Sequence, residues 1–348
     1  MSGRRKIRVL VVDDSALVRK VLCLGLGKDP DIEVIGQASD PYRARDLLVE
    51  LHPDVITLDV EMPRMDGVTF LKRFMPVMPV PTVVISSLTQ KGKRITLEAL
   101  AAGAVDVIAK PTVGVADGLP VMLDDICRRV KAAANVNVSG FTRQAEPIAE
   151  VGSSLGETTD RVIAIGASTG GVQALGRILP AFAHDAPGIV IVQHMPSGFT
   201  SSFAERLDSL CRMRVKEAED GDRILPGRVL LAPGGNRHMT IIRSGGEYRA
   251  ALVDGPPVNY SRPAVDVLFH SVAREVGRNA AAALLTGMGK DGAAGLLAIR
   301  QAGGATVAQD EATCIVFGMP NAAQEMGGAE RVLPLEKIPA HLVGALRR

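Results

Sequence analysis

Apolar residues recur along the chain in short runs that end on a polar residue or on a glycine-rich turn. In the first third, runs of strand length occupy residues 7–12, 32–35, 55–58, 83–85 and 105–108. The segments between them, such as 15–26 and 42–51, place apolar residues three and four positions apart, as amphipathic helices do. Strands that alternate with helices pair in parallel and are covered on both faces. The pattern therefore predicts a doubly wound α/β domain.

The rest of the chain repeats this alternation with longer turns. Strands are predicted at 161–166, 188–193, 229–232, 280–285 and 305–308, and helices at 172–179, from about 199, at 263–277, 293–301 and 320–326. Residues 239–242 and 248–253 indicate a β-hairpin. In 134–160 the periodicity fades and turn residues predominate, as in a tether. We predict one domain over 5–125, a linker over 126–159 and a second domain over 160–346, whose sheet is doubly wound and mostly parallel.

Composition narrows the class of protein. The chain has 348 residues, only 3% aromatics and no Trp, which is typical of aliphatic cores in parallel sheets. A formal net charge of +2 argues against nucleic acid as a partner of the whole protein. The four cysteines lie far apart without metal-like pairing, so reduced thiols are expected. No apolar run reaches the roughly 20 residues of a membrane span. We expect a soluble, cytoplasmic protein.

Polar residues of the first domain gather where its predicted strands end. They are Asp13, Asp14, Asp59, Ser86 and Lys110. Open α/β sheets bind ligands at this edge. Three carboxylates there repel one another unless a hard cation such as Mg²⁺ lies among them, and a lysine and a hydroxyl suit a phosphoryl group. One such Asp alone is commonly a helix N-cap, which accounts poorly for five residues together.

These residues also carry a family resemblance. Asp13-Asp14, Asp59 with Met62-Pro63 and Asp66-Gly67 after it, Ser86 and Lys110-Pro111 resemble a two-component receiver domain over about residues 5–125. The resemblance implies a flavodoxin-like (βα)5 fold with Asp59 as phospho-acceptor. It also implies that Asp13 and Asp14 help Asp59 to hold Mg²⁺, and that Ser86 and Lys110 sense the phosphoryl group.

In the second domain three reactive residue types follow predicted strands. Ser168 lies in Gly166-Ala167-Ser168-Thr169-Gly170-Gly171, His194 follows a buried strand, and Asp291 lies in a glycine-rich turn. A serine hydroxyl needs a base, and a histidine base needs an acceptor that fixes its tautomer. Backbone N–H groups near Met288 and after Ser168 are candidates for an oxyanion site. The residues thus predict a nucleophile, a base and an orienting acid.

Other readings of these residues stay open on sequence grounds. A lone Gly-x-Ser-x-Gly is weak evidence, and such a turn more often holds a phosphate or merely turns. A dinucleotide site is disfavoured, because the Gly-x-Gly-x-x-Gly spacing is missing and no acidic residue ends the second strand. Asp291 alone reads as a helix N-cap, and His238 is a rival base. The order Ser, His, Asp also differs from the orders of the common hydrolase families.

A second resemblance covers nearly all of residues 160–346. The motifs that carry it are Gly166–Gly171, Gln193-His194-Met195, Ala232–Gly235, Gly255–Asn259, Arg262–Phe269 and Thr286–Gly292. They resemble the chemotaxis protein-glutamate methylesterases, the CheB family. The resemblance implies Ser168 as nucleophile, His194 as general base and Asp291 as orienting acid, with Thr169 and the Met288 backbone as oxyanion and supporting positions. Tyr260 departs from the basic or His-like residue expected there, which bears on receptor specificity.

The resemblance further implies a function for the whole chain. It is phosphorylation-controlled hydrolysis of glutamate methyl esters, and deamidation of glutamines, on the helices of methyl-accepting chemoreceptors. A CheA-type histidine kinase is the implied phosphodonor, no cofactor is expected for the esterase, and a monomer is expected, at the membrane only through receptors. Two other classes compete: a receiver-controlled DNA-binding regulator with a C-terminal helix-turn-helix, and a non-catalytic binding module.

Overall fold

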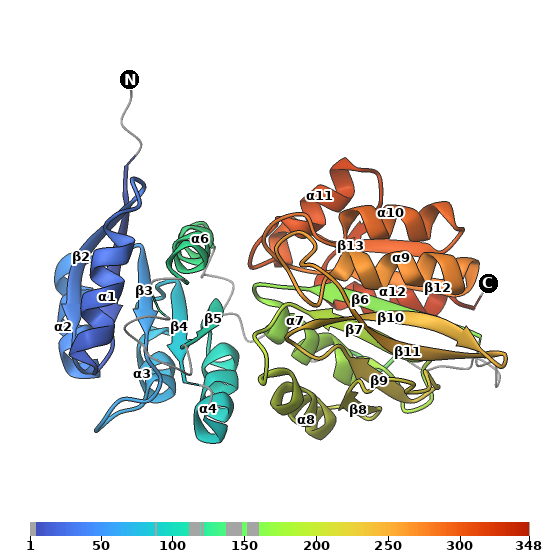
Figure 1. The fold of residues 1–348 in the computed structure, drawn as a ribbon, viewed down its shortest axis with the longest axis horizontal. Coiled ribbons are helices and arrows are strands. Elements are labelled where there is room, and N and C mark those ends of the chain that lie inside the picture. The colour runs from blue at the N-terminus through green and yellow to red at the C-terminus, as the bar shows by residue number, and fades with distance from the viewer. Residues whose placement is uncertain are drawn as a thin grey trace. The chain divides into compact units, whose positions relative to one another are not determined.

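The computed structural model describes residues 5–87, 89–110, 119, 122–136, 148–151 and 160–347. The chain divides into two compact units, Met1–Gln144 and Ala145–Arg348, which are described separately (Figure 1). The division falls within the predicted linker, most of which, like Pro111, lies outside the described residues. None of the described helices has the length and apolarity to span a bilayer.

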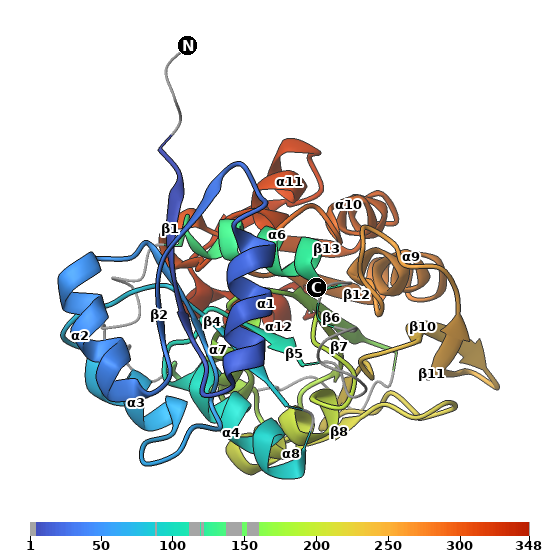
Figure 2. The ribbon, with the colours of Figure 1, turned by 60° about the vertical axis from the view of Figure 1, so that its left-hand side comes forward.

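The first unit contains a five-stranded parallel sheet in the order β2-β1-β3-β4-β5. Its strands are β1 (Ile7–Val12), β2 (Ile32–Ala38), β3 (Val55–Leu58), β4 (Thr82–Ser86) and β5 (Asp106–Ala109). Its helices are α1 (Ala16–Leu26), α2 (Pro41–Leu51), α3 (Gly67–Phe74), α4 (Gln90–Ala101) and α6 (Leu123–Ala133). Helix α1 packs beside α6, while α3 contacts both α2 and α4 (Figures 1 and 2). The order places the ends of β1, β3 and β4 side by side.

Helix α6 extends past the predicted domain boundary at residue 125. It buries Ile126 and Val130, four residues apart, and Lys131 Nζ lies 2.8 Å from Asp29 Oδ2 of the same unit. The first unit therefore continues at least through α6. Residues 126–133, which were predicted as linker, belong to this helix.

The second unit contains a seven-stranded parallel sheet in the order β14-β13-β12-β6-β7-β9-β8, with a separate antiparallel hairpin of β10 and β11. The strands are β6 (Val162–Ala167), β7 (Gly188–Gln193), β8 (Arg214–Glu217), β9 (Arg228–Leu231), β10 (Arg237–Ser244), β11 (Glu247–Asp254), β12 (Ala280–Leu284), β13 (Ala305–Gln309) and β14 (Arg331–Leu333). The α-helices are α7 (Gly171–Ile178), α8 (Thr200–Leu210), α9 (Val265–Glu275), α10 (Ala293–Gln301), α11 (Met319–Glu325) and α12 (Ile338–Ala345). Short 3₁₀ turns occupy Leu179–Ala181, Gly277–Asn279, Glu311–Thr313 and Leu335–Lys337.

The centre of this sheet is dry and aliphatic. All residues of β6, β7 and β12 are buried, and α9 packs against these strands on one side and against β10 on the other (Figure 1). The sequence analysis missed β8, β14 and α12. Strand β14 is three residues long and largely exposed, and α12 is apolar almost throughout, so neither has a clear amphipathic period. The sheet also excludes a helix-turn-helix as the body of this unit.

Candidate active site

Ser168 stands in a tight turn between β6 and α7. The Ser168 N–H donates to Thr286 O at 3.0 Å, and the Gly171 N–H donates to Ser168 O at 2.8 Å. Gly170 has a φ of 81°, which a residue with a Cβ adopts only under strain. A Cβ on Gly287 would lie 2.8 Å from Ser168 Cβ, so the turn after β12 passes directly against the serine. The glycines thus allow the two turns to meet.

His194 follows β7, which pairs in parallel with β6. The His194 N–H donates to Ala167 O at 3.0 Å. Buried Gln193 spans both turns, because its Nε2 donates to Ser168 O at 2.8 Å and to His194 O at 3.0 Å. The backbones that carry the predicted nucleophile and base are therefore joined by one amide. No role was predicted for Gln193 from the sequence, although it lies in the Gln193-His194-Met195 motif.

Asp291 completes the group from the turn after β12. Its Oδ2 lies 2.8 Å from His194 Nε2 and accepts the Val265 N–H at 2.7 Å. Its Oδ1 accepts the Asp266 N–H at 3.1 Å and Asn259 Nδ2 at 3.2 Å. Burial alone would raise the pKa of Asp291, but the His194 contact and the backbone donors outweigh burial, so the pKa is lowered. The carboxylate is held ionised beside the imidazole.

Asp291 does cap a helix, as its residue type suggests, but it is not the helix that follows it in sequence. The N-cap position of α10, the helix that follows Asp291, is Gly292, with a φ of 89°. Asp291 instead accepts the N–H groups of Val265 and Asp266 at the start of α9, 26 and 25 residues before it in sequence. One carboxylate therefore caps α9 and faces His194.

The ring nitrogens of His194 have different neighbours. Nε2 faces Asp291, while Nδ1 lies 3.4 Å from Ser261 Oγ. Within the part of the chain that the structure describes, the Ser168 hydroxyl donates no hydrogen bond to His194. Since Nε2 is taken by the carboxylate, Nδ1 is the nitrogen left to act on a hydroxyl. Hydrogen bonds between nucleophile and base often tighten only when substrate binds.

The turn that carries Met288 passes against Ser168 at Gly287, the residue before Met288. Gly287 is fixed on both sides, because its N–H donates to Val316 O at 3.0 Å and its carbonyl accepts from Met319 N at 2.8 Å. Thr286 Oγ1 donates to the carbonyl of buried Thr169 at 2.9 Å. Among the described residues the Met288 N–H has no acceptor. A rigid turn with an unused N–H near the serine suits an oxyanion.

His238 lies outside this group. Its Nδ1 accepts the Ala264 N–H at 3.1 Å, so its Nε2 carries the proton and contacts Pro256 O at 3.0 Å. Its exposed fraction is 2%. Both nitrogens therefore serve the backbone before α9, and the structure does not place His238 as a base for Ser168.

The first unit brings its five predicted residues to the ends of β1, β3, β4 and β5. Lys110 Nζ lies 2.6 Å from Asp59 Oδ2 and 2.8 Å from Asp13 Oδ2. Ser86 is fully buried at the end of β4, and Asp14 is exposed. Oxygens of Asp13, Asp14 and Asp59 lie within 4.8 Å of one another. Carboxylate oxygens at such spacing suit a hard divalent cation.

The pKa values of this cluster reflect crowding of negative charge. Burial raises the pKa of Asp59 to about 6; Asp13 adds to the rise, and Lys110 only partly offsets it. Burial also raises the pKa of Asp13. Burial would lower the pKa of Lys110, but Asp59 and Asp13 raise it. The site holds more negative charge than one lysine balances, and a divalent cation would correct this.

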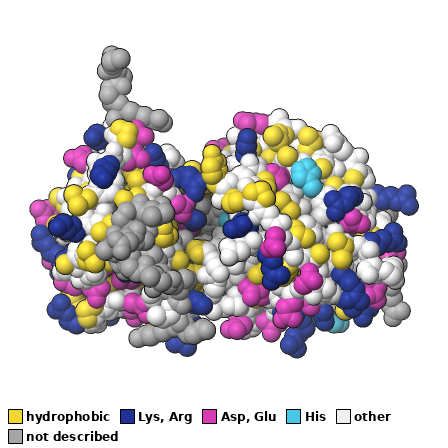
Figure 3. Space-filling model, viewed as in Figure 1, with side chains coloured by type: hydrophobic (Ala, Val, Ile, Leu, Met, Phe, Trp, Pro, Cys, Tyr) yellow, Lys and Arg dark blue, Asp and Glu magenta, His cyan; other side chains and the backbone are white. Residues whose placement is uncertain are grey.

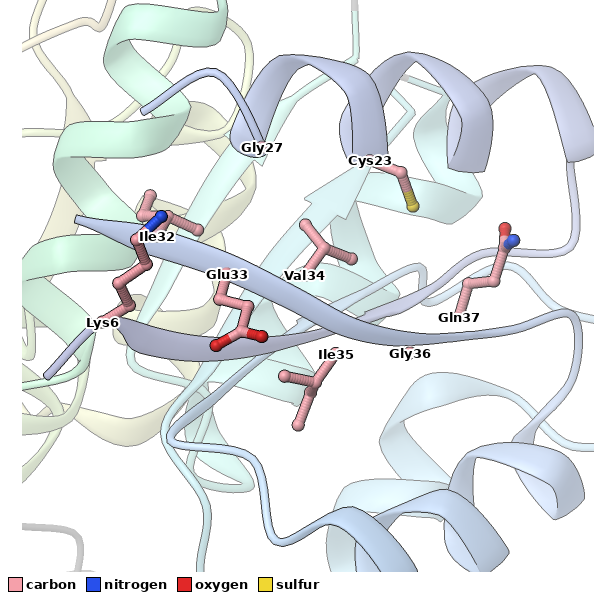
Figure 4. A pocket seen from close by; sticks show the side chains of 9 residues that line it. All are labelled: Lys6, Cys23, Gly27, Ile32, Glu33, Val34, Ile35, Gly36 and Gln37. Carbon is pink, nitrogen blue, oxygen red and sulfur yellow. The ribbon is translucent and has the colours of Figure 1, made fainter. Parts of the chain in front are cut away.

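Two surface features lie apart from these groups. A groove between α1 and β2 is lined by Lys6, Cys23, Gly27 and Ile32–Gln37, and includes none of the predicted site residues (Figure 4). On the face in view in Figure 3, Lys and Arg side chains of the described residues are interspersed with Asp and Glu. Such mixing differs from the basic band that a nucleic-acid-binding surface needs.

Comparison with known proteins gives the following similarities. A family model described as CheB methylesterase matches residues 163–342, and one described as response regulator receiver domain matches residues 9–116. The protein-glutamate methylesterase/protein-glutamine glutaminase of Syntrophotalea carbinolica is 56% identical, over 98% of this chain and 98% of its own. That of Salmonella typhimurium is 49% identical, over 98% of this chain and 97% of its own. The crystal structure of the Thermotoga maritima CheB methylesterase catalytic domain, 43% identical, matches 53% of this chain and 97% of that chain with a TM-score of 0.52.

Proposed function

Because the chain belongs to the CheB methylesterase family and carries a response-regulator receiver domain, we propose that it hydrolyses glutamate methyl esters on chemoreceptors at Ser168. Its enzyme class, protein-glutamate methylesterase and protein-glutamine glutaminase, follows from that membership. The observation that carries the site assignment is the 2.8 Å contact between His194 Nε2 and Asp291 Oδ2, formed where β7 and β12 flank the serine turn of β6. Ser168 is the nucleophile, His194 the base and Asp291 its orienting acid.

The geometry supports one route for the proton. Ser168 Oγ attacks the ester carbonyl and forms a C–O bond, while its proton passes to His194 Nδ1, since Nε2 is bound to Asp291. The negative charge on the carbonyl oxygen is stabilised by the Met288 N–H, with Thr169 in support. The C–O bond to methanol then breaks, and methanol takes the proton from Nδ1. Water hydrolyses the acyl-enzyme by the same steps, and a glutamine substrate releases ammonia instead of methanol.

The assignment of Ser168 is tested by substitution. Ser168→Ala removes the attacking oxygen, and triad knock-outs lower kcat by about three to six orders of magnitude. Methanol release from a methylated receptor is the measurement. Ser209→Ala, which changes an exposed serine on α8, is the matched control and should keep the wild-type rate. Near-wild-type release by Ser168→Ala would refute the proposed nucleophile.

For the receiver, we propose that Asp59 accepts a phosphoryl group from a CheA-type histidine kinase. Asp13, Asp14 and Asp59 would hold Mg²⁺, and the clustering of their oxygens supports this. When bound, the ion supplies positive charge to the transferring phosphoryl group. Lys110 and Ser86 would then read the new charge, and the 2.6 Å distance between Lys110 Nζ and Asp59 Oδ2 supports this role for Lys110.

We also propose that the unphosphorylated receiver restrains the esterase. Phosphorylation would then bias a modest interface between the domains. Coupling between two sites of one protein typically changes an equilibrium constant by about 5- to 150-fold. A fragment that starts near residue 155 should therefore release methanol several-fold faster than the unphosphorylated full chain. Equal rates would remove the inhibitory mechanism while leaving the esterase assignment intact.

A further inference from the structure

A strained turn just before α9 carries residues into the active site. The Val258 N–H donates to Ser261 O at 3.1 Å, and the Ser261 N–H donates to Val258 O at 2.9 Å. Between them Asn259 has a φ of 48° and Tyr260 a φ of 64°, both in the left-handed region. The outer residue, Tyr260, is 88% exposed, whereas the flanking Ser261 faces His194. A closed turn with two such residues holds the Asn259 side chain in a defined direction.

The Asn259 amide lies between two buried carboxylates. Its Nδ2 donates to Asp266 Oδ2 at 2.8 Å and to Asp291 Oδ1 at 3.2 Å. The exposed fractions of Asp266 and Asp291 are 7% and 2%. Asp266 is held in turn by the Gly295 N–H, which donates to Asp266 Oδ1 at 2.7 Å. The amide therefore connects the acid that faces His194 to the starts of α9 and α10.

Buried carboxylates this close repel each other, and a shared donor reduces that repulsion. The charged and titratable groups around the pair are His194 after β7, His270 on α9 and the two aspartates themselves. The two N–H groups of Asn259 Nδ2 donate to the two carboxylates and fix the orientation of Asp291 toward His194 Nε2. Without the amide, Asp266 N alone would hold Oδ1 of Asp291.

From this arrangement we propose that Asn259 is a positioning residue for the ester hydrolysis, which acts by fixing and keeping ionised the carboxylate of Asp291. The inference rests on the proposed function, because it assigns Asn259 a role through the Ser168, His194 and Asp291 group. Asn259 itself touches no reacting atom.

A substitution by glycine separates this role from a purely structural one. Glycine adopts positive φ freely, so Asn259→Gly removes the amide without adding strain to the turn. Tyr260→Gly is the matched control, since it makes the same change at the next left-handed position but removes an outward side chain. Asn259→Asp keeps the size and the tolerance of positive φ, and places a third carboxylate in the donor's position.

The experiment measures kcat, KM and the pH profile of kcat/KM for methanol release by the full-length chain, with thermal unfolding recorded for each variant. Loss of a hydrogen bond to a charged group changes a rate or equilibrium constant by about ten- to a hundredfold. Asn259→Gly should therefore lower kcat by about that factor, with KM nearly unchanged. Loss of a donor favours the protonated carboxyl, so the acid limb of the profile should move to higher pH, and further for Asn259→Asp. Tyr260→Gly should leave the acid limb in place.

The outcomes are distinguishable. Wild-type kcat and an unmoved acid limb in folded Asn259→Gly would overturn the positioning role while the esterase assignment stands. Equal shifts of the acid limb in Asn259→Gly and Tyr260→Gly would assign the effect to the turn backbone and would also overturn it. If wild type and Ser168→Ala released methanol at the same rate, the proposed function itself would fail.

Discussion

Two buried aspartates, one in each unit, stand at the carboxyl edge of a parallel sheet and differ in their proton affinity. Burial and the neighbouring Asp13 raise the pKa of Asp59 to about 6. Burial acts in the same direction on Asp291, but its donors reverse the effect and lower its pKa. Asp59 accepts from Lys110 Nζ and the Glu61 N–H. Asp291 accepts from two backbone N–H groups and Asn259, and contacts His194.

Burial acts on both carboxylates in the same direction, so the difference indicates that the neighbouring donors and charges decide which way the pKa of each one moves. The roles proposed for the two residues fit this. An aspartate that attacks a phosphoryl donor benefits from an oxygen that is not saturated with hydrogen bonds. An aspartate that orients a histidine needs a fixed, ionised carboxylate, and saturation supplies both.

The largest effect is expected for Asp291→Asn. It keeps the shape but cannot hold the imidazolium, so kcat for methanol release should fall by about three to four orders of magnitude. Labelling of Asp59 by a small phosphodonor should be unchanged. Asp254→Asn, an exposed change on β11, is the control and should leave both assays at wild-type values. A loss below tenfold would mean that the donors around Asp291 serve stability and not catalysis.

A second, smaller effect concerns the stability of the first unit. The folded pKa of Asp59, about 6, lies above that of an unfolded Asp, so its stabilising contribution exists at low pH and is lost as pH rises through about 6. In a metal chelator at pH 8, Asp59→Asn should therefore raise the free energy of unfolding of this unit by about 1–3 kcal/mol.

Calorimetry of the full chain at pH 5 and pH 8 checks this prediction. The difference in free energy of unfolding between Asp59→Asn and wild type should grow with pH. Asp46→Asn, whose side chain is 50% exposed, should change stability by less than about 0.5 kcal/mol at either pH. A destabilised Asp59→Asn at pH 8 would show that Lys110 offsets the burial of Asp59 more fully than its raised pKa indicates.

The smallest predicted effect concerns the side-chain amide of Gln193, which joins the turns that carry Ser168 and His194. Gln193→Leu keeps the volume but removes the donors to Ser168 O and His194 O, so kcat should fall by about tenfold and unfolding should cost about 1–3 kcal/mol less. Steady-state kinetics and thermal unfolding measure these effects. Since the proposed phospho-acceptor is in the other unit, labelling of Asp59 should not change. A full wild-type kcat would mean that the paired strands alone hold the two turns.

The sequence predicted the residue types of the site because reactive side chains end the strands of parallel sheets. Ser168, His194 and Asp291 follow that rule, and the structure brings them to three adjacent strands. It did not predict the strand order that makes β12, β6 and β7 neighbours, since order depends on long-range pairing. Residues 126–133 were predicted as linker but form most of α6. The four-residue spacing of the buried Ile126 and Val130 was the signal for this helix.

The hardest residues to predict were those that act only by holding another residue in place. Gln193 and Asn259 have no reactive group, and their contacts join segments 25 and 32 residues apart in sequence. Asp291 was expected to cap a helix, but the sequence alone did not show that this helix is α9, which precedes Asp291. A glutamine directly before the proposed base and an asparagine in a tight turn were visible signals, but only the packed structure shows their partners.

We propose that Ser168 performs the ester chemistry while Asp59 in the other unit controls it. The most direct test is methanol release from a methylated receptor, with and without a small phosphodonor and Mg²⁺, for wild type, Asp59→Ala and Ser168→Ala. We predict faster release by wild type with the phosphodonor, an unchanged low rate for Asp59→Ala, and almost no release by Ser168→Ala in either condition. Acceleration of Asp59→Ala by the phosphodonor, or substantial release by Ser168→Ala, would contradict the account.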